Sequence, residues 1–206
     1  MTHSPLTLYG LKLSGHSHRV ELFLRLLGLP YEYLETSPAS RQTDEFLAIN
    51  PLGQIPVLTD GGQVVADSNA ILVYLALNYD QKRRWYPTEP TVVAHIQRWL
   101  SIAAGEVRYG PATARVIQVF KRNGDLKAAQ TTASRLLRFM DTHLAAQNFL
   151  AHTTPTIADL ACYAYIAHAP EGEISLEPYA SVRAWLGRIE ALPEFIPMPG
   201  SPLPEH

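Results

Sequence analysis

Strand patterns end near residue 79 of this 206-residue chain, and that boundary limits its fold more than any other feature. Before it, alternating or β-branched segments suited to strands occupy residues 6–9, 30–35, 55–58 and 63–65. Residues 59–62 (Thr-Asp-Gly-Gly) have the composition of a hairpin turn between the last two strands. After residue 79, apolar residues recur at helical spacing in the segments 91–120, 125–147, 156–168 and 179–191. The chain therefore divides into a mixed α/β part and an all-helical part.

The order of the early segments predicts their topology. The predicted order is a strand, a helix from residue 18 to 27, a second strand, a short helix, two strands and a helix from Ser68. This order implies one parallel crossover and one antiparallel hairpin. We therefore expect an α/β domain with a mixed four-stranded sheet at residues 1–79, a charged linker at 80–90 and an all-α domain at 91–206. Pro111 should break or kink the first helix of the second domain, because proline removes a backbone hydrogen bond.

Composition excludes several classes of protein. A formal net charge of −2 and 17% charged residues argue against a nucleic-acid-binding protein. The sequence contains no apolar run of the roughly 20 residues that span a membrane, and no signal-peptide pattern. The single cysteine, Cys162, excludes an intrachain disulfide and a cysteine metal cluster, and the histidines lack metal-ligand spacing. We expect a soluble, cytoplasmic protein without a bound metal.

The first candidate site is the strand-to-helix turn at residues 11–19, which carries Ser14, His16 and Ser17 but no cysteine. A hydroxyl at a helix N-terminus can donate a hydrogen bond to a sulfur anion and lower the pKa of a thiol. A shift of two pH units requires roughly 2.7 kcal/mol. A charge-assisted hydrogen bond of about 1.5–3 kcal/mol and a helix-dipole contribution of about 0.3–1 kcal/mol suffice. By itself, the turn is more typical of simple helix capping.

Two further motifs could bind a peptide. In Asn-Pro-Leu-Gly-Gln-Ile-Pro-Val-Leu at residues 50–58, a cis bond before Pro56 would turn the backbone of Ile55 outward toward a bound peptide. Local sequence alone favours an ordinary edge-strand proline over the cis form. At residues 66–71, Asp67 and Ser68 open a helix, where Ser68 could donate to a carboxylate and Asp67 could pair with an ammonium. An N-cap with an acidic neighbour is the alternative.

Together, in this order and spacing, these motifs resemble the glutathione transferase family, in particular its bacterial, serine-type, theta- or nu-like cytosolic members. Residues 156–159 (Thr-Ile-Ala-Asp), a capping box, and residues 179–193 also resemble the family's late helices. The resemblance covers nearly the whole chain. It implies a thioredoxin-like N-terminal domain that binds glutathione and an all-helical C-terminal domain.

The resemblance also implies a role for each matching residue. Ser14 is expected to stabilise the glutathione thiolate, with Ser17 and His16 as competing donors. Ile55 would pair with the cysteinyl backbone beside a cis Pro56, and Asp67 and Ser68, where the family more often has Glu-Ser, would hold the γ-glutamyl group. The region expected to reach the glycine carboxylate consists of Arg41, Gln42 and Gln54.

The missing cysteine at this turn implies that the reactive sulfur arrives with glutathione as co-substrate. The expected reaction is attack of the thiolate on a small hydrophobic electrophile, or reduction of a hydroperoxide, in a homodimer. The electrophile pocket is expected between residues 9–13 and the helix at 99–115. Its candidate lining residues are Leu11, Glu106, Arg108, Tyr109 and Arg115, although a surface ion pair is the more common role for any one of the charged residues.

Two other functions on the same scaffold are weighed against the transferase. One is a non-catalytic protein-interaction module that resembles stringent-starvation proteins, and the other is an isomerase or dehalogenase. The complete set of expected glutathione contacts favours the transferase, and the serine-serine-cysteine turn of the isomerases is missing. Cys162 is expected to be buried and inert. Tyr165, Trp185 and Phe195 are expected to be core residues.

Overall fold

The computed structural model describes residues 6–201 and contains the mixed four-stranded sheet predicted from the sequence. Its strands are β1 (Leu6–Gly10), β2 (Tyr31–Glu35), β3 (Val57–Asp60) and β4 (Gln63–Ala66), in the order β2-β1-β3-β4. Strand β1 runs parallel to β2 and antiparallel to β3, and β3 and β4 form the hairpin. Gly61 and Gly62 at its turn both have positive φ, which explains the glycines there.

Helices occupy the positions predicted from the apolar spacing, with three additions. The N-terminal domain contains α1 (Gly15–Leu26), the 3-10 helix η1 (Ser40–Gln42), α2 (Asp44–Ile49) and α3 (Ser68–Tyr79). The second domain contains α4 (Pro90–Ile102), the π-helix η2 (Ala103–Ala112), α5 (Thr113–Phe120), α6 (Leu126–Leu144), α7 (Ile157–Ala167), the 3-10 helix η3 (Ala169–Gly172) and α8 (Ala180–Glu190). The elements η1, η2 and η3 were not predicted.

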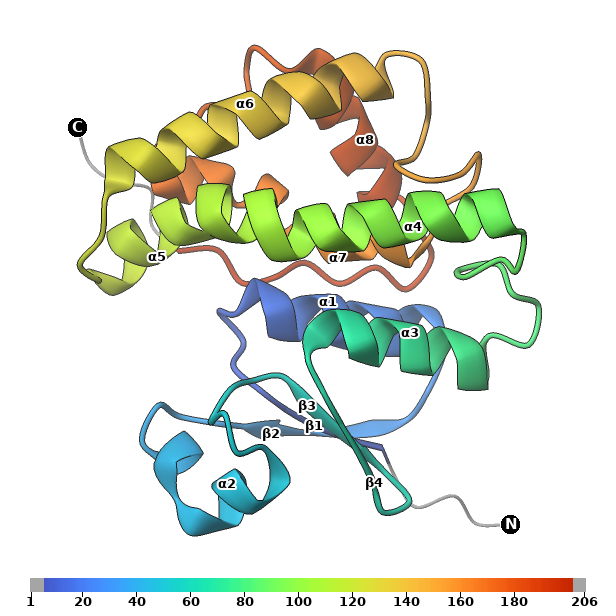
Figure 1. Cartoon of the computed structure of the whole chain (residues 1–206), viewed down its shortest axis with the longest axis vertical. Helices are drawn as coiled ribbons and strands as arrows, with labels where there is room; N and C mark the ends of the chain where they lie inside the picture. The colour runs from blue at the N-terminus through green and yellow to red at the C-terminus, as the bar shows by residue number, and fades with distance from the viewer. Residues whose placement is uncertain (1–5, 202–206) are drawn as a thin grey trace.

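Helices α1 and α3 lie between the sheet and the helical domain (Figure 1). Helix α7 is the core of that domain, and ten consecutive residues from Ile157 to Ile166 are buried. Thr156 and Asp159 form the predicted capping box at its N-terminus. Asp159 also accepts from the indole Nε1 of Trp185 at 2.9 Å, which ties α7 to α8. The placement of Cys162 and Trp185 in the core is confirmed, since both are fully buried.

Pro111 neither breaks nor kinks the chain into separate helices, contrary to the simplest expectation. It lies inside η2, where the backbone adopts the wider π-helical turn, which accommodates a residue without an N–H group. The carbonyl of Arg108 accepts from the backbone N–H of Thr113 and also from its hydroxyl, the latter at 2.8 Å. Gly110 allows this segment to pack closely on α6, because a Cβ there would lie 2.9 Å from the backbone nitrogen of Ala133.

The chain beyond α8 returns between the two domains (Figure 1). There the carbonyl of Ile196 lies 2.8 Å from Nε2 of His18 on α1. The linker is also packed rather than fully solvated, because Trp85 is buried against Phe23 of α1 at a ring distance of 5.4 Å. Within residues 6–201, no helix is both long and apolar enough to cross a membrane.

Candidate functional site

Ser14 caps helix α1 and still has a free hydroxyl proton. Its Oγ accepts from the backbone N–H of Ser17 at 3.3 Å, as an N-cap does. A hydroxyl can accept one hydrogen bond and donate another at the same time. Capping and donation to a sulfur anion are therefore compatible at this residue.

Ser17, the competing hydroxyl, faces the interior of the N-terminal domain. It is 0% exposed, and its Oγ accepts from the backbone N–H of Leu11 at 3.2 Å. The two serines face different surroundings because Ser14 is the N-cap, with extended backbone (φ −93°, ψ 116°), whereas Ser17 lies inside the helix. Ser14 is the serine that lines a cavity.

His16 is the second donor at this turn. Burial, together with the positive charges of Arg19 and Arg108, holds the pKa of His16 well below its usual range. Its Nδ1 lies 3.3 Å from Oγ of Ser68, which already accepts from Nη1 of Arg19 at 3.1 Å. We assign the hydroxyl proton of Ser68 to this Nδ1, so the hydrogen of the neutral ring is on Nε2. His16 is therefore an uncharged N–H donor.

Asp67 begins helix α3 with an unusual backbone conformation, φ 72° and ψ 126°. Its Oδ1 accepts from the backbone N–H groups of Asn69 and Ala70 at 2.8 and 3.1 Å. A non-glycine residue with positive φ carries strain of order 1–3 kcal/mol, and such residues concentrate at functional sites. A carboxylate is held at the N-terminal end of α3.

The peptide bond between Ile55 and Pro56 is cis, as the family resemblance implies and contrary to the ordinary proline expected from local sequence. Strand β3 begins one residue later, at Val57. Before it, Asn50 donates from Nδ2 to the carbonyl of Gln54 at 2.8 Å, which closes the loop that presents these residues.

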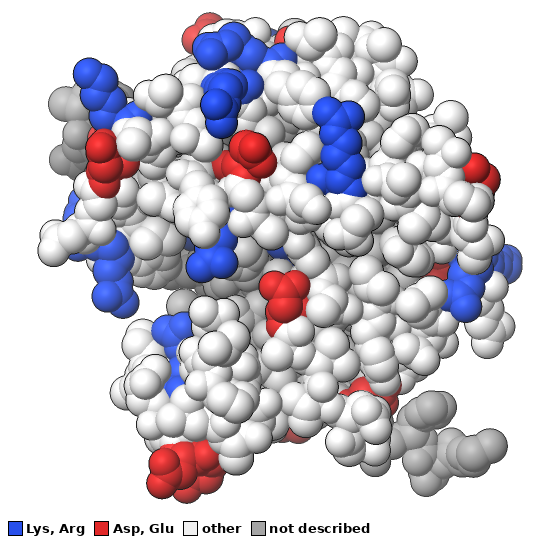
Figure 2. All heavy atoms as spheres, viewed as in Figure 1, with Lys and Arg blue, Asp and Glu red and all other residues white. Residues whose placement is uncertain are grey.

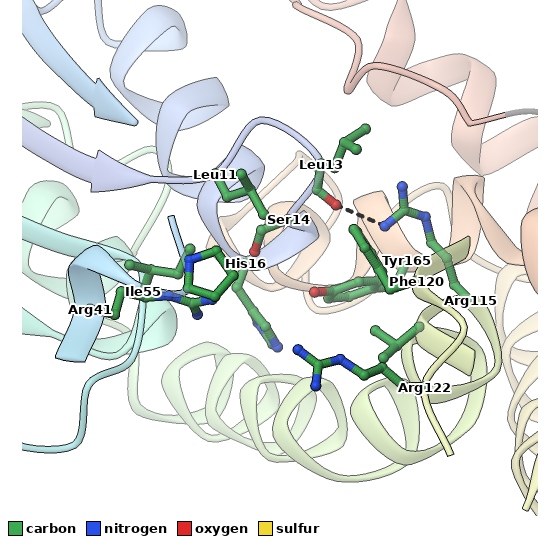
Figure 3. A pocket seen from close by; sticks show the side chains of 12 residues that line it. Leu11, Leu13, Ser14, His16, Arg41, Ile55, Arg115, Phe120, Arg122 and Tyr165 are labelled. Atoms are coloured by element: carbon green, nitrogen blue, oxygen red, sulfur yellow. Dashed lines mark hydrogen bonds between the residues drawn. The ribbon is translucent and has the colours of Figure 1, made fainter. Parts of the chain in front are cut away.

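Two adjoining cavities open between the domains, where Figure 2 shows a hollow with basic side chains on both sides. The first, of about 290 Å³, is called the apolar-walled cavity, and Figure 3 shows most of its lining: Leu11, Leu13, Ser14, His16, Pro38, Arg41, Ile55, Arg115, Val116, Phe120, Arg122 and Tyr165. The second, of about 420 Å³, is called the polar cavity and is lined by His16, Arg41, Asn50, Leu52, Gln54, Ile55, Pro56, Ala66, Asp67, Ser68 and Arg108. His16, Arg41 and Ile55 line both.

Most of the predicted site residues meet at these cavities, but three do not. Glu106 lines a separate pocket with Arg98 and Phe139, between α4 and α6. Tyr109 is 62% exposed and lines neither cavity. These two assignments assumed α-helical geometry, whereas the wider turn of η2 changes which of its residues face the hollow. Gln42 is exposed and lies instead against the turn at Gly53.

Several cavity residues were not proposed as site residues from the sequence, and three of them differ from what was expected or lie beyond the expected pocket. Tyr165, expected only in the core, is buried but lines the apolar-walled cavity. Phe120 and Arg122 lie at the end of α5, and the left-handed conformation of Lys121, φ 51°, turns the chain between them. No local sequence signal marks these residues, because their placement depends on how the two domains pack. Among residues 6–201, no group of three or more His, Cys, Asp or Glu side chains is arranged to hold a metal ion.

Comparison with known proteins matches both halves of the chain. Residues 8–83 match the family described as "Glutathione S-transferase, N-terminal domain", and residues 94–193 match "Glutathione S-transferase, C-terminal domain". Glutathione S-transferase 3 of Zea mays is 32% identical, across 97% of this chain and 98% of the maize protein. The chain belongs to the glutathione S-transferase family.

Other members of the glutathione S-transferase family agree in sequence and fold. Human glutathione S-transferase theta-2 is 30% identical over 87% of this chain and 78% of its own length. The crystal structure of a glutathione S-transferase from Pseudomonas fluorescens superposes with a TM-score of 0.88 at 32% identity, covering 95% of this chain and 99% of that one. A transferase homologue from Drosophila mojavensis with bound glutathione has a TM-score of 0.83 at 26% identity, covering 92% and 89%.

These relatives support an enzyme of the glutathione S-transferase type and do not favour the non-catalytic interaction module. The thioredoxin-like N-terminal domain and the helical C-terminal domain expected from the sequence are confirmed.

Proposed function

We propose that the polar cavity binds glutathione and that the apolar-walled cavity binds a small hydrophobic electrophile. Asp67 would pair with the ammonium of the γ-glutamyl group, and the hydroxyl of Ser68 would turn from Nδ1 of His16 to donate to its carboxylate. Ile55 would pair with the cysteinyl backbone beside Pro56. Arg41 and Gln54 would reach the glycine carboxylate. Gln42, which lines neither cavity, would act only through the Gly53 turn.

The placement of the Ser14 hydroxyl, which caps α1 and lines the apolar-walled cavity, is the observation that carries this proposal. The Oγ of Ser14 already accepts from the helix amide of Ser17, so its proton can be donated to the glutathione sulfur. The N-terminus of α1 adds favourable potential for an anion at the same place. We infer that the bound thiol ionises near neutral pH and attacks an electrophilic carbon. His16 would be a secondary donor.

The electrophile would lie against Leu11, Leu13, Val116 and Phe120, which are apolar lining residues of the first cavity. Arg108 lines the polar cavity rather than this one, so it would face glutathione and not the electrophile. The pocket for the electrophile thus combines apolar walls with a hydroxyl at its base, as a small hydrophobic substrate requires.

Several broader features belong to the same proposal. We propose residues 1–79 and 91–206 as the two domains, with 80–90 as the linker, in a cytoplasmic homodimer of the serine-type, theta-like group. Large apolar side chains exposed on the N-terminal domain, such as Leu52 (76%), Val64 (46%) and Leu77 (44%), support a partner surface. Light scattering of the purified protein would measure its mass, and a monomer at micromolar concentration would contradict the dimer.

The decisive experiment combines glutathione binding with a panel of electrophiles. Calorimetry with glutathione is expected to show binding at one site per chain. Aryl halides, enones, isothiocyanates and hydroperoxides should then be assayed for glutathione-dependent turnover. Binding without turnover of any of them would contradict the transferase, and absence of binding would favour the interaction module.

A further inference from the structure

The hydroxyl of Tyr165 has no protein partner although the residue lies in the core. Tyr165 is 5% exposed, and among residues 6–201 no group forms a hydrogen bond with its hydroxyl. Tyr163, two residues earlier on α7, does have a protein partner, because its hydroxyl donates to Oε1 of Glu190 at 3.0 Å. The ring of Tyr165 is buried, but its hydroxyl is not among the fully enclosed polar atoms of the described residues, and the residue lines the apolar-walled cavity. The hydroxyl is therefore free to bond to a molecule in that cavity.

The ring of Tyr165 is held firmly against the first turn of α1. It meets the ring of His16 edge-on at 5.0 Å, with an angle of 72° between the planes. A Cβ on Gly15 would lie 2.8 Å from Cζ of Tyr165, the atom that carries the hydroxyl. Glycine between Ser14 and His16 thus lets the phenol lie directly beside the proposed catalytic serine. A donor held this rigidly needs no reorganisation when it acts.

Tyr165 faces the electrophile rather than glutathione. It lines the apolar-walled cavity and is not part of the lining of the polar cavity, where Asp67, Ser68 and Pro56 lie. In Figure 3 its hydroxyl points into the same open space as the hydroxyl of Ser14, and the two approach from different domains. A sulfur hydrogen-bonded to Ser14 would therefore have the phenol on the side from which the second substrate enters.

We propose that Tyr165 is a second catalytic residue, which donates a hydrogen bond to an electrophile oxygen that gains an electron pair as the sulfur attacks. The substrate class that uses such a donor is the α,β-unsaturated carbonyl compounds. This inference rests on the proposed function of the site.

The reaction balances without a further reagent. The thiolate forms a C–S bond to the β-carbon, and the C=C electron pair moves toward the carbonyl oxygen, which becomes an enolate. The phenol of Tyr165 stabilises that negative charge. Water then delivers a proton to the α-carbon, which replaces the proton that the thiol lost. The product is a thioether with its carbonyl restored. Alkyl halides differ, because their electron pair leaves with the halide and no oxygen gains charge.

This difference provides the test. Tyr165→Phe keeps the ring against His16 and Gly15 and removes only the hydroxyl. Its kcat/KM should be measured with glutathione and 4-phenyl-3-buten-2-one, and with glutathione and benzyl chloride. The third measurement is a pH titration of thiolate absorbance in the enzyme–glutathione complex, which gives the pKa of the bound thiol. Tyr163→Phe is the matched control, since that hydroxyl bonds to Glu190 instead of facing the cavity.

With Tyr165→Phe, kcat/KM for the enone should fall by about tenfold or more, as for the loss of one oxyanion donor. Turnover of benzyl chloride and the thiol titration should match the wild type, and the titration also shows that the site is folded. Unchanged enone turnover would overturn the inference. An equal loss for both electrophiles with a higher thiol pKa would also overturn it, because the phenol would then serve the sulfur. If the wild-type protein shows no thiolate and no turnover, the proposed function itself fails.

Discussion

The guanidinium of Arg115 donates through Nη1 to the carbonyl oxygen of Leu13 at 2.8 Å, so the helical domain holds the residue that precedes Ser14. Its Nε donates to Oε2 of Glu171 at 2.6 Å, and both side chains are almost completely buried. The other oxygen of Glu171 accepts from the backbone N–H of Ser201 at 3.0 Å. The position of the catalytic turn therefore depends on contacts from α5, η3 and the C-terminal segment.

Arg115→Met should destabilise the protein strongly. Removing one partner of a buried ion pair typically costs about 3–5 kcal/mol, and Glu171 would keep only the contacts of its Oε1 with His168 and Ser201. Urea unfolding at pH 7 would measure the loss. Arg122→Met, at an exposed arginine, should change the free energy of unfolding by less than about 0.5 kcal/mol. The double variant Arg115→Met/Glu171→Gln should regain part of the loss, and a single variant as stable as the wild type would contradict the role of the pair.

Ser14→Ala should raise the pH at which bound glutathione ionises by about one to two units, because it removes a charge-assisted hydrogen bond of about 1.5–3 kcal/mol. Glutathione affinity measured with the neutral thiol should be nearly unchanged. Thiolate absorbance across a pH titration checks the shift. Ser17→Ala is the control, since that hydroxyl is buried and bonds to Leu11. Equal titration curves for Ser14→Ala and the wild type would remove Ser14 from the mechanism.

Asp67→Asn should raise the KM for glutathione by about tenfold or more, which corresponds to the loss of one charged hydrogen bond. Asparagine still caps the helix and tolerates positive φ, so α3 should remain intact. A glutathione analogue without the α-amino group separates the two roles, since the variant and the wild type should use it equally well. A KM defect of the variant that is as large with that analogue as with glutathione would show that Asp67 acts through structure alone.

His18 should make the protein sensitive to mild acid. Burial, partly opposed by the hydrogen bond with the carbonyl of Ile196, lowers the pKa of His18 to about 4. The unfolded chain takes up this proton at about pH 6.5 and the folded protein does not, so the free energy of unfolding falls as pH decreases from about 6.5 to 4. His18 should account for up to about 3 kcal/mol of that fall.

His18→Gln should flatten the pH dependence, while His16, whose pKa is also lowered, maintains part of it. Urea unfolding at pH 7 and pH 4.5 would measure the slope. His95→Gln, at an exposed histidine on α4, should leave the slope unchanged. A slope that is the same in the wild type and in His18→Gln would show that the buried imidazole is not responsible.

The sequence by itself determined the division of this protein into a mixed α/β part and a helical part, and most of its helices and strands. Alternation before residue 79 and helical spacing after it are local properties of neighbouring residues, so they predicted the sheet, its hairpin and the long helices. The same holds for the capping box at Thr156 and Asp159, whose hydrogen bonds span only three residues. Local motifs also drew attention to Ser14, Ile55, Pro56, Asp67 and Ser68.

Only the tertiary structure decided which of these groups face a common space. Which of Ser14 and Ser17 lines the cavity depends on how the first turn of α1 packs against the sheet. In the sequence, both serines are equally suited to donate to a thiolate. The π-helical turn at Pro111 moved Glu106 and Tyr109 out of the site, because a change of backbone period rotates every side chain within it. Tyr165 and Arg115 reach the catalytic turn from far along the chain, since packing of the two domains, and not local spacing, brings them there.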